Sequence, residues 1–166
     1  YPGRELLGWR RHVVHLKDLQ ATVVLDEVRA RDGAEIEARF HSGVRLEAGT
    51  DHVRLRGEDG VLAHIPLSDG PVVLRQGRHA IQLVHGGYGL EHESYYGWIT
   101  RAQGSGATPL VSLLLPVSSE ADAAAMVRSA RLERHSDGSL DIRFAFAGSR
   151  HTLRFEQENE GWIWSE

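Results

Sequence analysis

Alternation of apolar and polar residues with a period of two constrains the fold of this chain most strongly. In the segment Glu35–His41 the apolar residues Ile36, Ala38 and Phe40 alternate with charged residues. Successive side chains of a β-strand point to opposite faces, so this segment predicts a strand with one buried and one solvated face. Similar segments recur, and we expect strands at residues 9–16, 21–28, 35–41, 52–56, 61–65, 72–74, 80–84, 95–100, 110–115, 130–134, 140–146, 151–155 and 162–164.

Turn signals separate these segments. Asp-Gly pairs occur at Gly33, Gly60, Gly70 and Gly138, and glycine accepts the positive φ that tight hairpin turns require. About a dozen short strands with such turns predict an all-β fold, an antiparallel β-sandwich, in one domain spanning residues 1–166. One short helix is expected within residues 118–127, where alanines follow a serine suited to cap the helix.

Composition and charge narrow the possible partners. Of the 166 residues, 41% are hydrophobic and 25% charged, which is typical of a globular domain. The net charge of -4 argues against a nucleic-acid partner. No apolar run approaches the roughly 20 residues needed to cross a membrane, so no membrane partner is expected. The absence of cysteine excludes disulfides and thiolate chemistry.

Three regions carry a resemblance to a known family. The first pairs the basic, valine-rich segment Arg10–Leu16 with the segment Val23–Val28. The second is Ile36–His41, which ends in Phe-His, and the third joins Ser94–Trp98 to the apolar segment Val111–Pro116. Together they resemble the distal part of heparinase II/III-like polysaccharide lyases. The resemblance implies that this chain is the C-terminal β-sandwich portion of a larger lyase, and the first residue, Tyr1, fits an excised piece.

The resemblance implies a parent enzyme that degrades uronate-containing glycans by β-elimination. In that reaction a base removes the proton beside the uronate carboxylate while other groups stabilise the enolate. The family's catalytic histidine and tyrosine lie in an α/α-toroid domain, and a further histidine lies in an early strand of the sandwich. Many members also hold a structural zinc through His-Ala-Asp and His-Asn-Thr segments. Neither segment occurs here, where the single asparagine is Asn159, so no catalytic residue or cofactor is assigned to this chain.

Candidate substrate contacts gather in one polar and aromatic cluster. His92, Tyr95, Tyr96 and Trp98 follow a Gly-Gly pair that would let a ligand approach the backbone. Aromatic rings stack on the apolar faces of sugars, and a histidine beside a tyrosine can act as base and acid. The alternative is that the tyrosines pack in the interior with their hydroxyls at the surface.

No metal site is predicted, although the chain contains ten histidines. His12 and His15 are three residues apart, and on a strand this spacing places them on opposite faces. Two further features are interpreted as structural. Near the C-terminus, Trp162 and Trp164 are expected to pack in the core. The arginines Arg54, Arg56, Arg75 and Arg78 are expected to lie on solvated strand faces.

Three functional hypotheses follow. The first is a scaffold that completes the substrate cleft of a polysaccharide lyase, is inactive alone, and has the toroid domain and an acidic polysaccharide as partners. The second is a stand-alone carbohydrate-binding β-sandwich, which exposed aromatic residues would favour. The third is a small complete enzyme that uses His92 with Tyr95 or Tyr96. We expect a parent lyase of this family to be periplasmic or extracellular.

Overall fold

The computed structural model describes residues 6–82, 90–104, 106–158 and 161–165. Within these ranges the side chains of residues 79–82, 90–94, 157–158 and 161–162 lie outside the description. Thirteen strands in the described residues form three antiparallel sheets. The predicted all-β sandwich is therefore confirmed.

Sheet A is the central sheet and has six strands in the order β1-β2-β9-β6-β5-β4. They are β1 (Leu6–Leu16), β2 (Ala21–Ala30), β9 (Thr108–Val117), β6 (Val61–Ser68), β5 (Val53–Arg56) and β4 (Arg45–Ala48). A short 3-10 turn, Lys17–Leu19, joins β1 to β2.

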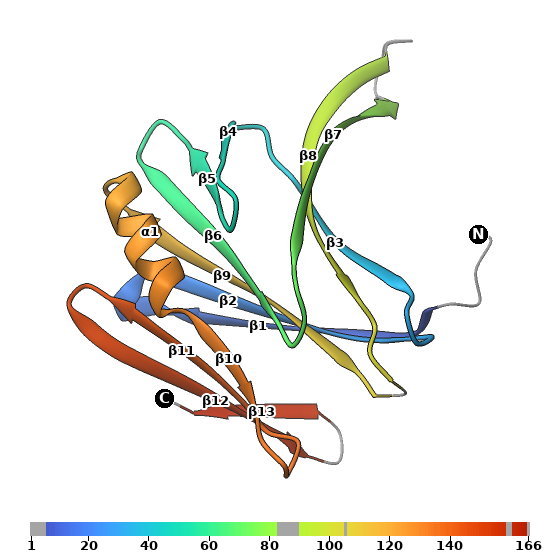
Figure 1. The fold of residues 1–166 in the computed structure, drawn as a ribbon. Helices are drawn as coiled ribbons and strands as arrows, with labels where there is room; N and C mark the ends of the chain where they lie inside the picture. The colour runs from blue at the N-terminus through green and yellow to red at the C-terminus, as the bar shows by residue number, and fades with distance from the viewer. Residues whose placement is uncertain (1–5, 83–89, 105, 159–160, 166) are drawn as a thin grey trace.

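Two smaller sheets lie on opposite sides of sheet A (Figure 1). Sheet B has the order β3-β8-β7, formed by β3 (Glu35–His41), β8 (Leu90–Arg101) and β7 (Val73–Gln82). Sheet C has the order β10-β11-β12-β13, formed by β10 (Arg131–Arg134), β11 (Leu140–Phe146), β12 (Ser149–Glu158) and β13 (Gly161–Ser165).

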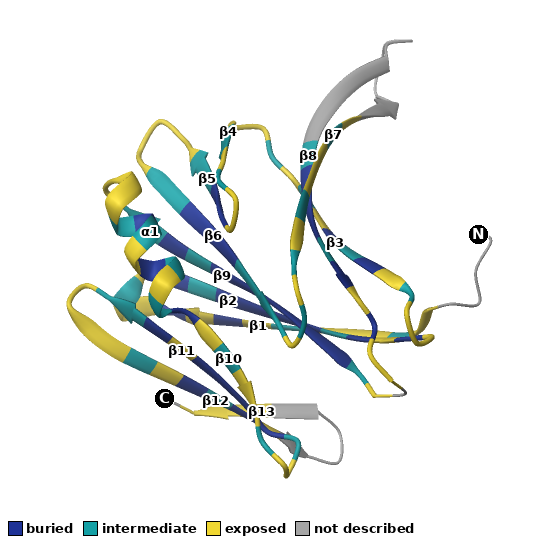
Figure 2. Ribbon diagram, viewed as in Figure 1, coloured by how far each residue is buried: buried dark blue, intermediate teal, exposed yellow. Residues whose placement is uncertain are grey.

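The larger core lies between sheets A and C. One face of sheet A contributes Val23, Leu113 and Ile65, and sheet C contributes Ile142 and Leu153, all at most 1% exposed. Buried residues are concentrated in β2 and β9 of sheet A and in β11 of sheet C (Figure 2). Sheet B covers the opposite face of sheet A. Because β2 and β9 are thus buried on both faces, their sequences are apolar almost without interruption.

The single helix of the described chain, α1 (Glu120–Ser129), covers one end of this core with Ala123 and Met126. Its serine cap is confirmed, because the backbone N–H of Asp122 donates to Oγ of Ser119 at 3.1 Å. No helix among the described residues is long and apolar enough to cross a membrane.

Two strands differ from the prediction. The segment Arg45–Ala48 was not predicted, because four residues in a glycine-flanked stretch give too little alternation to detect. The segments predicted at 72–74 and 80–84 contribute residues 73–74 and 80–82 to one strand, β7, which also contains Gly77; residues 83–84 lie outside the described residues. A Cβ at Gly77 would lie 2.6 Å from the hydroxyl oxygen of Tyr95, so glycine makes room there for a neighbouring ring.

Candidate functional site

The predicted substrate contacts lie on β8, the central strand of sheet B. In its antiparallel register with β3, Tyr96 is opposite Phe40 and Trp98 is opposite Ala38, whereas Tyr95 is opposite His41. Because side chains alternate along a strand, Tyr96 and Trp98 share the face toward sheet A and Tyr95 lies on the other face. The strand therefore divides the predicted cluster between an inner and an outer surface.

Tyr96 and Trp98 are each only 1% exposed and surround His64 of β6, which is fully buried. The indole Nε1–H of Trp98 donates to Nε2 of His64 at 3.1 Å. In a neutral imidazole the other nitrogen then carries the proton, so Nδ1 of His64 donates to the Tyr96 hydroxyl at 2.7 Å. The three side chains form a hydrogen-bonded cluster inside the second core, between sheets A and B.

Burial shifts the ionisation of this cluster. Desolvation lowers the pKa of His64 to about 3, so the imidazole is neutral near pH 7. Desolvation also raises the pKa of the Tyr96 hydroxyl above its ordinary value. The rings of Tyr96 and Trp98 are covered, which corrects the expectation that they contact substrate: neither can stack on a sugar in this structure. Sequence reasoning missed His64, whose apolar neighbours Ala63 and Ile65 were the available signal.

Tyr95 lies on the outer face of sheet B and is half-buried. The guanidinium of Arg39 lies 4.2 Å from the centroid of its ring, and Arg39 is itself held by hydrogen bonds to Glu37, the shorter one 2.8 Å long. The backbone of His92 pairs with Ala80 in sheet B, but its side chain lies outside the described residues. Tyr95 is thus the one predicted contact whose described side chain remains accessible.

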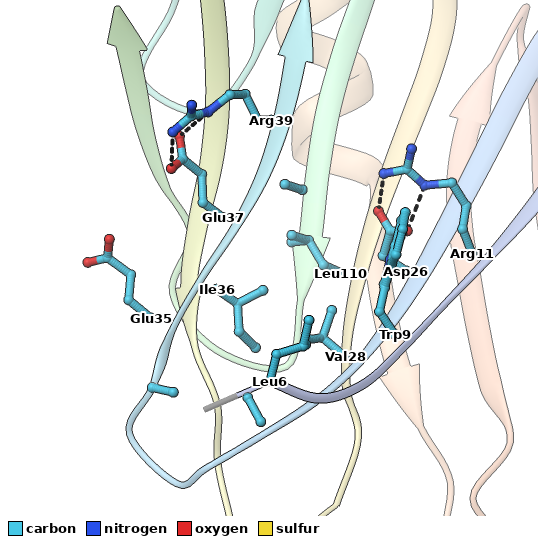
Figure 3. Close-up of a pocket in the computed structure, with 13 residues that line it drawn as sticks. Leu6, Trp9, Arg11, Asp26, Val28, Glu35, Ile36, Glu37, Arg39 and Leu110 are labelled. Carbon is cyan, nitrogen blue, oxygen red and sulfur yellow. Dashed lines mark hydrogen bonds and ion pairs between the residues drawn. The ribbon is translucent and has the colours of Figure 1, made fainter. Parts of the chain in front are cut away.

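A cleft of about 540 Å³ opens between β1 and β2 on one side and β3 on the other (Figure 3). Apolar side chains, among them Val28, Ile36 and Leu110, line its interior. On the side of β1, Trp9 remains 59% exposed, and the guanidinium of Arg11 lies 5.2 Å from the centroid of its ring. The cleft therefore combines an apolar interior with an exposed indole.

Asp26 organises the β1 side of this cleft. Its carboxylate is only 2% exposed and accepts hydrogen bonds from Nε of Arg11 at 2.7 Å, from Nη2 of Arg11 at 2.8 Å and from Nε1 of Trp9 at 2.9 Å. On β3, Ile36 points into the cleft, whereas the ion pair of Arg39 and Glu37 lies on the opposite face of the strand (Figure 3). Both guanidiniums are already paired, so the cleft offers no unbalanced positive charge to an anion.

One group of possible metal ligands lies in sheet C, formed by Glu133, His135 and Asp141. Burial raises the pKa of Asp141, but hydrogen bonds from Arg143 and His135 outweigh this effect, so its pKa is lowered overall. Arg143 also pairs with Glu133 at 3.0 Å. The guanidinium of Arg143 therefore pairs with two of the three possible ligands, Glu133 and Asp141. We describe this group as an ion-pair network rather than as a cation site.

The structure also locates the arginines and the C-terminal tryptophan considered in the sequence. Arg54 and Arg56 pair with Glu47, and Arg75 pairs with Glu35 at 3.0 Å, so these arginines lie in ordinary ion pairs on strand faces. Trp164 is 47% exposed, which corrects the prediction that it packs in the core. It lies on β13, the edge strand of sheet C, whose outer side has no strand beside it in the described residues.

Comparison with known proteins supports a specific fold. No family model matches the sequence, and no curated protein matches it. Solved structures do match. A heparinase III structure superposes with a TM-score of 0.67 at 16% identity, covering 90% of this chain and 23% of that chain. The heparan sulfate lyase HepC from Pedobacter heparinus also gives a TM-score of 0.67, at 13% identity, covering 93% of this chain and 24% of that chain.

A further heparinase III structure matches with a TM-score of 0.65 at 13% identity, covering 90% of this chain and 24% of that chain. This chain thus spans about a quarter of the length of the structures it matches. The resemblance inferred from the sequence is confirmed at the level of the fold. The chain has the fold of a β-sandwich portion of heparinase III structures.

Proposed function

We propose that this chain is the C-terminal β-sandwich of a polysaccharide lyase that cleaves uronate-containing glycans by β-elimination. In this proposal it is inactive alone, and it packs against an α/α-toroid catalytic domain of the same polypeptide to complete the substrate cleft. The observation that carries the proposal is the match of 90% of this chain to about a quarter of a heparinase III structure.

The chemistry of the described residues supports a scaffold role. The hydrogen bond between His64 and Tyr96 joins a possible base to a possible acid, but both side chains are buried. A β-elimination needs a base that reaches the proton beside the uronate carboxylate. This pair cannot meet a polysaccharide in this fold, so its contribution is to hold sheet B on sheet A.

We further propose that Tyr95 contacts the glycan on the outer face of sheet B. The guanidinium of Arg39 stacks on the ring of Tyr95, and the ring lies over Gly77. Because Tyr95 is already positioned, glycan binding would cost little of its side-chain entropy. Tyr96 and Trp98 would then position β8 from its inner face. In the full-length enzyme, Tyr95→Ala is expected to raise KM with little change in kcat, whereas an unchanged KM would contradict this contact.

A second candidate function is a stand-alone carbohydrate-binding module. Trp9 and Trp164 favour it, because they are 59% and 47% exposed and could stack on sugars. The two functions are separated by assaying the native protein for lyase activity. Release of unsaturated uronate products supports the first candidate, and glycan binding without such products supports the second.

A further inference from the structure

Strand β1 forms a free edge of sheet A. It is eleven residues long and stands at the end of the sheet order, with β2 as its one paired neighbour in the described residues. Large apolar side chains are exposed along it: Leu6 is 60% exposed, Leu7 68%, Trp9 59% and Val13 62%. A long edge strand with exposed apolar side chains is a template for pairing with another strand.

Three of the other described edge strands are short or carry paired charges, and β13, which also exposes apolar side chains, has only five residues. The opposite edge of sheet A, β4, has four residues and carries Arg45 and Glu47. The edge strand β10 also has four residues, three of them charged. The edge strand β3 carries the paired side chains of Glu37 and Arg39. Short length and charges of both signs discourage edge pairing, and β1 has neither.

The charge of β1 indicates which strand would fit. Its sequence contains Arg10, Arg11, His12 and His15 and no acidic residue. Arg11 is paired with Asp26 and His12 lies 3.7 Å from Glu27, whereas the side chain of Arg10 is exposed. In an antiparallel pairing of β1 with a second copy, basic residues would lie opposite basic residues, which is destabilising. An acidic strand is the complementary partner.

We propose that the free edge of β1 takes an additional β-strand, from a segment that alternates apolar and acidic residues. This inference rests on the proposed function for its source, since the segment would belong to the longer polypeptide of the parent lyase. Its backbone would pair with β1, and its apolar side chains would cover Trp9 and Val13, which lie on one face of the strand. Its carboxylates would lie near Arg10.

A probe peptide tests the edge directly on this chain. We would titrate a synthetic peptide of alternating valine and glutamate and follow hydrogen exchange of the β1 amides. The proposal predicts saturable binding with slowed exchange in β1. A peptide with lysine in place of glutamate should bind roughly tenfold or more weakly. A glutamate peptide methylated at its backbone nitrogens should not bind, because it cannot form the ladder.

Two substitutions of one exposed residue supply matched controls. Val13→Asp and Val13→Lys remove the same apolar side chain and differ in the sign of the new charge. Thermal unfolding confirms that both variants fold, and Val13→Asp should then bind the glutamate peptide several-fold more weakly than Val13→Lys. Equal affinities for the two variants would overturn the proposal. Equal binding of the methylated peptide, or dimerisation through β1 without peptide binding, would also overturn it.

Failure of this inference is separate from failure of the proposed function. Peptide binding is measured on this chain alone, whereas the proposed function is tested by the mass and lyase activity of the native protein. If the native protein is a lyase but this chain does not bind the acidic peptide, the edge proposal is refuted and the proposed function is retained.

Discussion

His64 lies in the interior between sheets A and B as a neutral imidazole with both nitrogens hydrogen-bonded. A buried polar group is tolerated when its hydrogen bonds are satisfied, and here Trp98 donates to one nitrogen while Tyr96 accepts from the other. Phe40 adds an edge-on ring contact with a centroid distance of 4.5 Å. The cluster therefore fixes the position of sheet B on sheet A as well as filling the core.

This cluster predicts acid sensitivity. The pKa of His64 is about 3 in the folded protein and 6.5 in the unfolded chain. Its contribution to stability is therefore complete above pH 6.5. As pH falls below 6.5, the unfolded state binds a proton that the folded state does not, and the free energy of unfolding falls until about pH 3. Between pH 7 and pH 5 the loss from His64 alone is about 2 kcal/mol.

The effect of His64 is isolated by comparison with His64→Gln. Glutamine can still accept one hydrogen bond and donate another, but it does not titrate. Urea unfolding at pH 7 and pH 5 should show that the stability advantage of the unsubstituted protein shrinks by about 2 kcal/mol at the lower pH. An advantage that stays constant between the two pH values would contradict the assignment of a neutral buried imidazole.

The two adjacent tyrosines give a second prediction. Tyr96→Phe leaves the buried Nδ1–H of His64 without an acceptor, which should cost about 1 to 3 kcal/mol of unfolding free energy. Tyr95→Phe is the matched control, because Tyr95 lies on the outer face and no described residue hydrogen-bonds its hydroxyl. Chemical denaturation of both variants checks this, and equal losses would contradict the division of β8 into an inner and an outer face.

At the scale of elements, Asp26 attaches the edge strand β1 to the rest of sheet A through Arg11 and Trp9. Asp26→Asn keeps the shape but weakens these charge-assisted hydrogen bonds, and Arg11 is 38% exposed, so solvent screening limits the effect. We expect a loss of about 1 to 2 kcal/mol in unfolding free energy. Faster hydrogen exchange should be confined largely to β1.

The exposed residue Arg10, also on β1, supplies the control for this element. Arg10→Gln removes a positive charge from the same strand without touching Asp26, so stability and the exchange of β1 amides should remain nearly unchanged. A uniform increase in exchange throughout the sheets after Asp26→Asn would show that the carboxylate supports the whole fold rather than the edge strand.

The helix gives a simpler test of the same kind. The side chain of Ser119 caps α1 by accepting from the N–H of Asp122, and Ser119→Ala should cost about 1 kcal/mol. Ser136→Ala, in an exposed turn, should cost much less. Thermal unfolding compares the two variants, and equal effects would contradict the capping role.

The elements themselves were largely predictable from local sequence. Alternation identified Glu35–His41 because one face of β3 is solvated, and the serine before an alanine-rich segment located α1. The candidate site was less predictable, because it depends on which sheets face each other. Period two correctly separates Tyr95 from Tyr96, but it does not say which face is buried. The pairing of Tyr96 with His64 joins residues 32 apart, beyond any local signal.

At the scale of the whole molecule, the central sheet is covered on both faces, which suits a structural role. Sheet C and α1 close one face, and sheet B closes part of the other (Figure 1). The exposed apolar residues of β1 and the neighbouring cleft leave one region where further polypeptide would bury apolar surface. This exposed apolar surface fits the proposed place of the sandwich beside a toroid domain.

The most direct test of this account is the intact mass of the native protein, captured from its source cell with an antibody against this domain. We predict a mass several times the 18.5 kDa of this chain, in a protein that releases unsaturated products from a uronate-containing polysaccharide. A native mass near 18.5 kDa would contradict the claim that this sandwich is part of a polysaccharide lyase.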